Sequence, residues 1–236
     1  MEGKQTELQK ATARSNAYLL FAKAIEYPNE TSAGQVRGGE LAGALEALLA
    51  IVAPALCEGL RTDALRDAGG DDDALAVEYT RLFDVGASGP PCPLFGGSYG
   101  GTRMKTMEEA IRFYEHFGLE TAQATRELPD HLATELEFLH FLTFSEAEAL
   151  ETGTDPGSFR RAQRDFLARH PGRWVPDLHE RVQQHDPMAF FGELIRALND
   201  FLAFELSSLG AVVEQIDLDQ AAGTPLVMNQ NYPADR

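Results

Sequence analysis

The sequence predicts an all-α protein built as a single globular helical domain with a long ordered loop inside it. Apolar residues recur three and four positions apart through most of the 236 residues, which is the spacing of one face of an α-helix. Proline and glycine stand where these periodic stretches end, as expected at helix termini. No segment alternates apolar and polar residues as a half-buried strand does, so no sheet is predicted.

Two helices are predicted in the N-terminal part of the chain, over residues 6–27 and 40–60. Pro28 ends the first helix. Pro54 is expected to kink or break the second, because proline lacks the amide hydrogen that a helix interior uses. The polar residues 29–39 between them are expected to form turns.

A short helical piece over residues 62–67 precedes an aspartate-rich stretch at 69–73. Aspartate suits the cap and first turn of a helix, because its carboxylate accepts hydrogen bonds from free amides and favours the positive end of the helix dipole. The helix predicted after this stretch contains Tyr79, Leu82 and Phe83.

Residues 84–101 form a predicted loop unlike the rest of the chain. Its last sixteen residues hold six glycines and three prolines, which excludes a helix. Leu94, Phe95 and Tyr99 favour an ordered loop over a linker, because linkers seldom carry such side chains.

Five more helices are predicted in the C-terminal half, over residues 103–117, 129–151, 155–169, a short stretch ending at Gln184, and 186–209. Residues 170–176 are expected to form a turn. In the last helix the pattern points Phe191, Leu194, Ile195, Leu198, Phe201 and Leu202 inward, and Glu193, Arg196, Asn199 and Asp200 to water. The domain is expected to occupy residues 1–210, with a flexible tail over 211–236.

Composition and charge limit the classes of partner. The formal net charge is −17, which argues against binding nucleic acid or an anionic membrane through the general surface. Cys57 and Cys92 lie far apart and indicate neither a zinc site nor a disulfide framework. No run of 18 apolar residues is present and the N-terminus lacks the apolar core of a signal peptide, so we expect a cytoplasmic protein without stable membrane association.

Two short patterns suggest enzymatic chemistry but lack the context it needs. Residues 96–100 match the nucleophile pattern G-x-S-x-G, yet that pattern requires a parallel sheet, which this chain does not predict. None of the six histidines forms an H-E-x-x-H pair, so each is better explained by a structural role than by metal binding. We therefore predict no catalytic residues and no metal site.

Asp130 and His131 stand at the start of the strongly apolar stretch 129–151 and have two interpretations. In the structural one, Asp130 stabilises the first helical turn and His131 fills a polar niche. In the functional one, the helix start presents an acceptor and a switchable donor to a partner. Residue types alone favour the structural interpretation.

Three motifs in order give the chain a resemblance to a known family. They are Tyr79-Thr-Arg-Leu-Phe83, the Pro/Gly-rich loop ending at Tyr99, and Glu127-Leu-Pro-Asp-His131 leading into the apolar helix. This arrangement resembles the TorD/DmsD/NarJ family of redox-enzyme maturation chaperones, over roughly residues 12–210. The segments 81–97 and 99–104 are most similar to the branch that serves type II DMSO-reductase-family enzymes.

The resemblance implies a TorD-like helical bundle that has no chemistry of its own. It implies a cytoplasmic chaperone that binds the catalytic molybdenum subunit and its twin-arginine signal peptide, assists insertion of the client's bis-molybdopterin guanine dinucleotide, and delays export. It also implies a client-binding set made of Tyr79, Leu82, Phe83, Pro91, Gly97, Tyr99, Glu127, Pro129, Asp130 and His131. Some members carry tryptophan in place of Tyr79 and Glu-Ser in place of Gly97-Ser98, which puts the loop's detailed contacts in question.

Two alternatives stay open at this point. In one, the Gly-rich loop binds guanine nucleotide through its amides and the protein is a regulator, although no P-loop sequence is present. In the other, the helices only form a scaffold that dimerises. The sequence does not decide between a monomer and a homodimer, nor does it identify the client.

Overall fold

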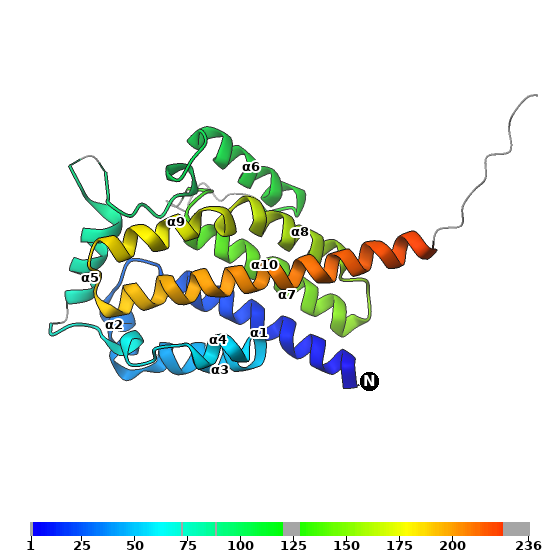
Figure 1. Ribbon diagram of the computed structural model, residues 1–236, viewed down its shortest axis with the longest axis horizontal. Coiled ribbons are helices and arrows are strands. Elements are labelled where there is room, and N and C mark those ends of the chain that lie inside the picture. The colour runs from blue at the N-terminus through cyan, green and yellow to red at the C-terminus, as the bar shows by residue number, and fades with distance from the viewer. Residues whose placement is uncertain (1, 72, 88, 120–127, 224–236) are drawn as a thin grey trace, which may run out of the picture.

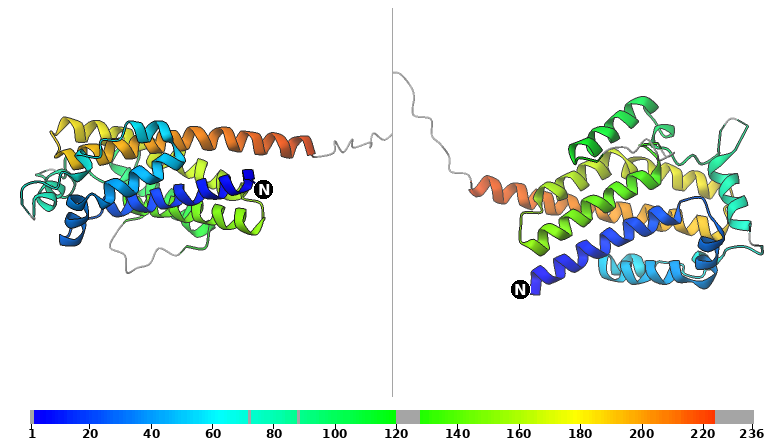
Figure 2. Two further views of the ribbon diagram at one scale, coloured as in Figure 1. Left: turned by 90° about the horizontal axis from the view of Figure 1, so that it is seen from below. Right: turned by 180° about the vertical axis from the view of Figure 1, so that it is seen from behind.

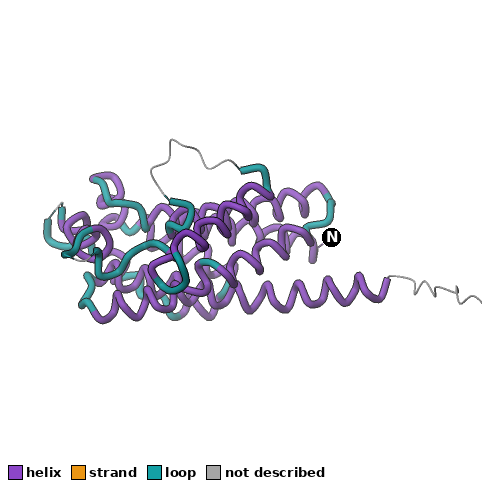
Figure 3. The backbone as a smooth tube through the Cα atoms, turned by 90° about the horizontal axis from the view of Figure 1, so that it is seen from above, coloured by secondary structure: helices purple, strands orange, loops and turns teal. Residues whose placement is uncertain are grey.

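The computed structural model describes residues 2–71, 73–87, 89–119 and 128–223 (Figure 1). Over these ranges the chain is helical, with connecting loops and no strand, as the tube in Figure 3 shows. Short 3-10 turns cover Ala64–Arg66 and Gly96–Ser98, and a π-helical turn covers Thr80–Asp84. The α-helices are α1 (Glu2–Ala24), α2 (Glu30–Gly38), α3 (Glu40–Val52), α4 (Pro54–Glu58), α5 (Ala74–Tyr79), α6 (Arg103–His116), α7 (Leu132–Thr152), α8 (Gly157–Arg169), α9 (Pro171–Gln184) and α10 (Ala189–Gly223). The all-α prediction is confirmed.

Helix α7 lies at the centre of the bundle. It packs along α1 on one side and against α8 on the other, and α10 crosses α8 and α9 (Figures 1 and 2). Leu132, Leu136, Leu139 and Leu142 of α7 have no exposed surface. The periodic apolar positions of the central helix therefore form the core of one domain, as the sequence predicted.

An ionic cluster joins four helices inside this core. Arg14 of α1 donates hydrogen bonds to Glu146 of α7 (2.9 Å), to Gln163 of α8 (2.7 Å) and to Glu205 of α10 (2.7 Å). Burial pushes the pKa of Glu146 upward, but the cations of Arg14 and Arg160 outweigh it and hold that pKa below its usual range. Such a paired cluster fixes how the helices sit against each other, since losing one partner leaves a buried charge uncompensated.

The turn prediction for residues 29–39 was wrong, because this segment contains α2. Asn29 caps the helix: its side chain accepts a hydrogen bond from the Ser32 amide (3.0 Å), and the Ser32 hydroxyl accepts one from the Asn29 amide (2.8 Å). Ala33 and Val36, three positions apart, are buried. A short helix with two buried positions gives too weak an apolar period to be recognised without its cap.

Proline decides two other boundaries. The predicted break at Pro54 is confirmed, because α3 ends at Val52 and Pro54 opens α4. The turn predicted over residues 170–176 was wrong: Pro171 is the first residue of α9, and Pro176 lies inside that helix. Proline is tolerated at a first helical position, where the missing amide hydrogen has no intrahelical partner to lose.

Helix α10 departs from the prediction in two ways. It continues past Leu209 to Gly223, and Val213 has no exposed surface. Glu193 was predicted to face water but is fully buried, where it accepts hydrogen bonds from the Arg61 amide (2.9 Å) and the Arg61 side chain (2.7 Å). The inward set from Phe191 to Leu202 is buried as predicted.

Candidate functional site

The three sequence motifs meet where the Gly/Pro-rich loop passes between the π-helical turn and the start of α7. Backbone hydrogen bonds of 2.9 Å run from the Cys92 amide to the Leu82 carbonyl, from the Gly96 amide to the Asp130 carbonyl, and from the Leu132 amide to the Leu94 carbonyl. Cys92 and Leu94 are buried, so the prediction of an ordered loop is confirmed. We call this meeting point the motif junction, made of residues 79–83, 91–99 and 128–132.

Asp130 holds the Gly/Pro-rich loop in place through a hydrogen bond with its backbone. Its side chain has no exposed surface, and its Oδ2 accepts a hydrogen bond from the Gly97 amide at 3.0 Å. The apolar helix begins at Leu132 rather than at residue 129, with His131 as its cap: His131 Nδ1 accepts from the Ala133 amide at 3.3 Å. In this arrangement both residues have the structural roles of loop support and helix cap.

The same hydrogen bond bears on the guanine-nucleotide alternative. A glycine loop binds phosphate through amides that point at the anion. Here the Gly97 amide already donates to the chain's own carboxylate, Asp130. No observation on the described part of the chain supports nucleotide binding by this loop.

Close backbone approach explains the glycine pair of the loop. A Cβ at Gly96 would lie 2.9 Å from Trp174 Nε1, and a Cβ at Gly97 would lie 2.8 Å from the Cα of Arg103 at the start of α6. Both distances are shorter than real Cβ contacts, so a side chain at either position requires the neighbouring Trp174 or Arg103 to shift.

Tyr99 ends the loop in an aromatic stack. Its ring lies parallel to that of Trp174 with centroids 5.1 Å apart, and the Arg181 guanidinium sits 4.5 Å from its centroid. Its hydroxyl donates to the Pro93 carbonyl at 2.8 Å, and burial raises the pKa of that hydroxyl. Tyr99 is therefore a packed anchor of the loop.

A buried polar cluster that sequence reasoning missed lies under the loop. Trp174 Nε1 donates to Glu135 Oε2 at 2.9 Å, and His170 Nδ1 lies 3.4 Å from Glu135 Oε1. Burial raises the pKa of Glu135 well above its usual range and lowers the pKa of His170 to about 4. His170 is therefore neutral at pH 7, so its contact with Glu135 is not an ion pair. The sequence feature that could have indicated this cluster is Glu135, a glutamate on the inward face of the apolar helix.

The first motif is packed against the end of the bundle where α9 meets α10. Tyr79, Leu82 and Phe83 are buried, and the Tyr79 ring makes edge contacts with Tyr27 (5.3 Å) and Phe83 (5.2 Å). Phe83 in turn contacts Phe191 of α10 at 5.5 Å. Tyr27 covers this group from the outside and is 56% exposed.

The predicted client-binding residues thus come together, but not as an open cleft. Pro91 and Pro129 are half-buried, and the Pro129 carbonyl accepts from the Tyr114 hydroxyl at 2.7 Å. Glu127 lies outside the described residues. A groove of about 890 Å³ between α6, α7 and α8, and a pocket of about 250 Å³ between α1, α2 and α3, are both lined by other residues.

Over its described residues the chain is an all-helical protein whose sequence motifs gather at one loop–helix junction. Residues 41–180 match the family model described as nitrate reductase delta subunit. The chain belongs to this family, which comprises the TorD/NarJ assembly chaperones. Its members are assembly proteins and not catalysts.

Within this family, the chain is similar to assembly chaperones of selenate, perchlorate and chlorate reductases. The selenate reductase assembly chaperone of Thauera selenatis is 31% identical over 86% of this chain and 93% of its own length. The perchlorate reductase assembly chaperone of Dechloromonas aromatica is 30% identical over 86% and 92%. The chlorate reductase assembly chaperone of Ideonella dechloratans is 39% identical over 52% of this chain and 65% of its own length.

Proposed function

We propose that the chain is the dedicated assembly chaperone of one type II DMSO-reductase-family enzyme. In this function it binds the catalytic molybdenum subunit in the cytoplasm, assists insertion of the client's bis-molybdopterin guanine dinucleotide, and delays export until the subunit has folded. The observation that carries the proposal is the similarity to a selenate reductase assembly chaperone over 93% of that relative's length. The protein holds no cofactor itself in this proposal.

We also propose that it binds the client's twin-arginine signal peptide. Such a signal combines a cationic n-region with an apolar h-region. A chain with a net charge of −17 attracts cations, and an apolar surface between helices buries the h-region. Signal peptide and acidic chaperone are therefore complementary in both respects.

For the motif junction we propose a client-binding face in which its members have different roles. Asp130 is fully buried and bonded to Gly97, so its role is to hold the loop rather than to meet a client cation directly. Pro91, Gly97 and Pro129 reach the surface in part, and in this proposal they touch the client. Tyr79, Leu82, Phe83, Tyr99 and His131 support them from beneath.

Co-expression tests the proposal. The chain is expressed with, in turn, the catalytic subunits of a selenate, chlorate, perchlorate and dimethyl sulfide enzyme, each carrying its signal. We expect one subunit to co-purify with the chain and to gain molybdenum content only in its presence. A subunit from an unrelated exported enzyme serves as the control. If all four subunits acquire molybdenum equally without the chain and none co-purifies, the proposal is wrong.

A further inference from the structure

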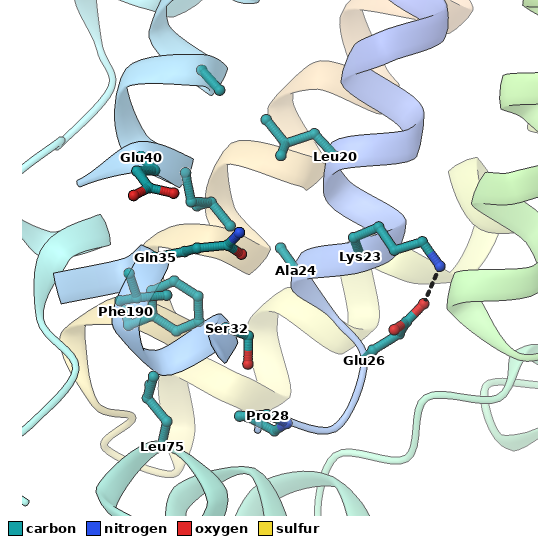
Figure 4. Close-up of a pocket in the computed structure, with 13 residues that line it drawn as sticks. Leu20, Lys23, Ala24, Glu26, Pro28, Ser32, Gln35, Glu40, Leu75 and Phe190 are labelled. Atoms are coloured by element: carbon teal, nitrogen blue, oxygen red, sulfur yellow. Dashed lines mark hydrogen bonds and ion pairs between the residues drawn. The ribbon is translucent and has the colours of Figure 1, made fainter. Parts of the chain in front are cut away.

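A pocket of about 250 Å³ opens between α1, α2 and α3, and none of its lining residues belongs to the three family motifs (Figure 4). Helix α5 and the start of α10 close its floor with Leu75 and Phe190. Most of its wall is apolar, formed by Leu20, Ala24, Val36 and Leu41 among others. An apolar hollow of this size accepts one or two aliphatic side chains of a partner, which gain burial that the open surface does not offer.

The entrance of this pocket is acidic. A shallower hollow of about 700 Å³ adjoins it, shares Lys23, Glu26, Ser32 and Gln35 with it, and adds Glu30. Glu40 stands on the pocket's opposite side, in the first turn of α3. Among the residues that line the two hollows, three glutamates therefore stand against one cation, Lys23.

That single cation is already paired. The Lys23 ammonium donates to Glu26 Oε1 at 2.6 Å, drawn as the dashed line in Figure 4, and lies 3.5 Å from Glu137. Glu30 and Glu40 are exposed, and neither takes part in an ion pair with a described residue. Two carboxylates are thus left at the entrance to meet the cations of a partner.

The larger groove between α6, α7 and α8 has the opposite character. Its aromatic floor is bordered by three arginines, Arg112, Arg161 and Arg169, and by two acids, Glu109 and Asp165. A cationic segment is repelled there and attracted at the α1–α2–α3 pocket. Charge complementarity distinguishes the two hollows.

Contact continuity supports the pocket as part of the client face. Phe190 of its floor makes an edge contact with Phe191 at 4.9 Å, and Phe191 contacts Tyr79 of the first motif at 6.1 Å. Pro28 lines the pocket, and its neighbour Tyr27 covers Tyr79 at 5.3 Å. A peptide seated in the pocket would lie next to the motif junction.

We infer that the pocket between α1, α2 and α3 seats the start of the signal peptide's apolar region, with the preceding arginines held by Glu30 and Glu40. This inference rests on the proposed function, which supplies the peptide. It assigns the recognition of that peptide to residues outside the predicted client-binding set.

Calorimetry with a synthetic signal peptide of about 25 residues, two adjacent arginines followed by a Leu/Ala-rich stretch, tests the inference. The variant Glu30→Lys with Glu40→Lys is expected to weaken binding about tenfold, and low salt should increase the difference. Ala44→Phe, which fills the pocket from an exposed lining position on α3, is expected to weaken it at least as much. The matched controls are Glu46→Lys with Glu58→Lys and Ala47→Phe, all exposed and outside the lining.

The outcomes separate this inference from the proposed function. Much weaker binding in both pocket variants, with at most a slight loss of binding in the controls and unchanged thermal midpoints, supports the inference. Wild-type affinity in the two pocket variants overturns it and leaves the proposed function standing. A wild-type chain that co-purifies with its catalytic subunit but does not bind the peptide overturns this inference and the proposed signal-peptide binding, and leaves the proposed assembly of the catalytic subunit standing. Only a chain that does neither contradicts that assembly function.

Discussion

The burial of Asp130 indicates a structural role for this residue rather than direct contact with a client. Its carboxylate has no exposed surface and accepts a hydrogen bond from the Gly97 amide at 3.0 Å, so its loss leaves that part-buried donor without this partner. We expect Asp130→Ala to lower the free energy of unfolding by about 1–3 kcal/mol, measured by urea denaturation. Asp177→Ala, at an exposed position, is the control and should change stability by less than about 0.5 kcal/mol. Equal stability of both variants would mean that the hydrogen bond between Asp130 and Gly97 does not stabilise the fold.

His170 predicts a pH dependence of stability. The folded imidazole is buried and stacked on Phe166 at 4.4 Å, and burial lowers its pKa from 6.5 to about 4. The unfolded chain therefore takes up this proton first as the pH falls, and stability is lost between pH 6.5 and about 4, by about 3 kcal/mol in full. The His170→Gln variant should show a flatter curve of unfolding free energy in this window.

The exposed His185 supplies the matched control for that measurement. His185→Gln should keep the wild-type slope between pH 6.5 and about 4, because it leaves the buried His170 unchanged. Glu135 acts in the opposite sense: burial raises its pKa, so its contribution is lost as the pH rises. A His170→Gln curve as steep as that of the wild type would mean that His170 is not the group responsible.

At the scale of elements, the sequence predicted best where many buried positions share one period. The inward faces of α7 and α10 follow from such long patterns, and both are buried as expected. Helix α2 was missed because Ala33 and Val36 are its only buried residues, too few to give a helical apolar pattern. The sequence feature that indicates this helix is its capping box, made by Asn29 and Ser32. Glu193 was misplaced because its partner Arg61 is 132 positions away, and no local pattern reveals such a contact.

The same limit applied to the candidate site. The motifs identified which segments matter, and the structure brings those segments together through backbone hydrogen bonds. Which side chains stay accessible depends on how the loop and α7 pack. The sequence alone therefore did not predict that Asp130 and Tyr99 are buried. The pocket between α1, α2 and α3 could not be predicted from the sequence either, because its lining comes from five helices.

The length of α10 carries a prediction about truncation. Leu209 is 3% exposed and Val213 has no exposed surface, so the helix still packs on the bundle beyond the domain end predicted at residue 210. A chain ending at Gly210 should lose about 1.5–3 kcal/mol of stability with the buried Val213, measured by thermal and urea unfolding. A chain ending at Gly223, which keeps all of α10, should unfold like the full chain. Indistinguishable truncations would restore residues 211–236 as a dispensable tail.

At the scale of the whole molecule, the net charge of −17 acts on the encounter with a client before any contact forms. Electrostatic attraction mainly raises the association rate and is screened by salt, whereas burial in an apolar pocket mainly sets the dissociation rate. We expect stopped-flow mixing with the twin-arginine peptide to show kon falling about tenfold between about 0.02 M and about 0.5 M salt, with koff nearly constant.

A peptide with both arginines replaced by glutamine isolates that effect. At low salt, the kon of this glutamine peptide should be lower than that of the arginine peptide, and it should hardly change with salt. Its koff should exceed that of the arginine peptide only through the loss of the pairs with Glu30 and Glu40. The Glu46→Lys, Glu58→Lys control should lower kon for the arginine peptide slightly, because it changes net charge but not the pocket. If both peptides show the same salt dependence, attraction by the acidic surface plays no part in recognition, and burial alone would have to account for the affinity.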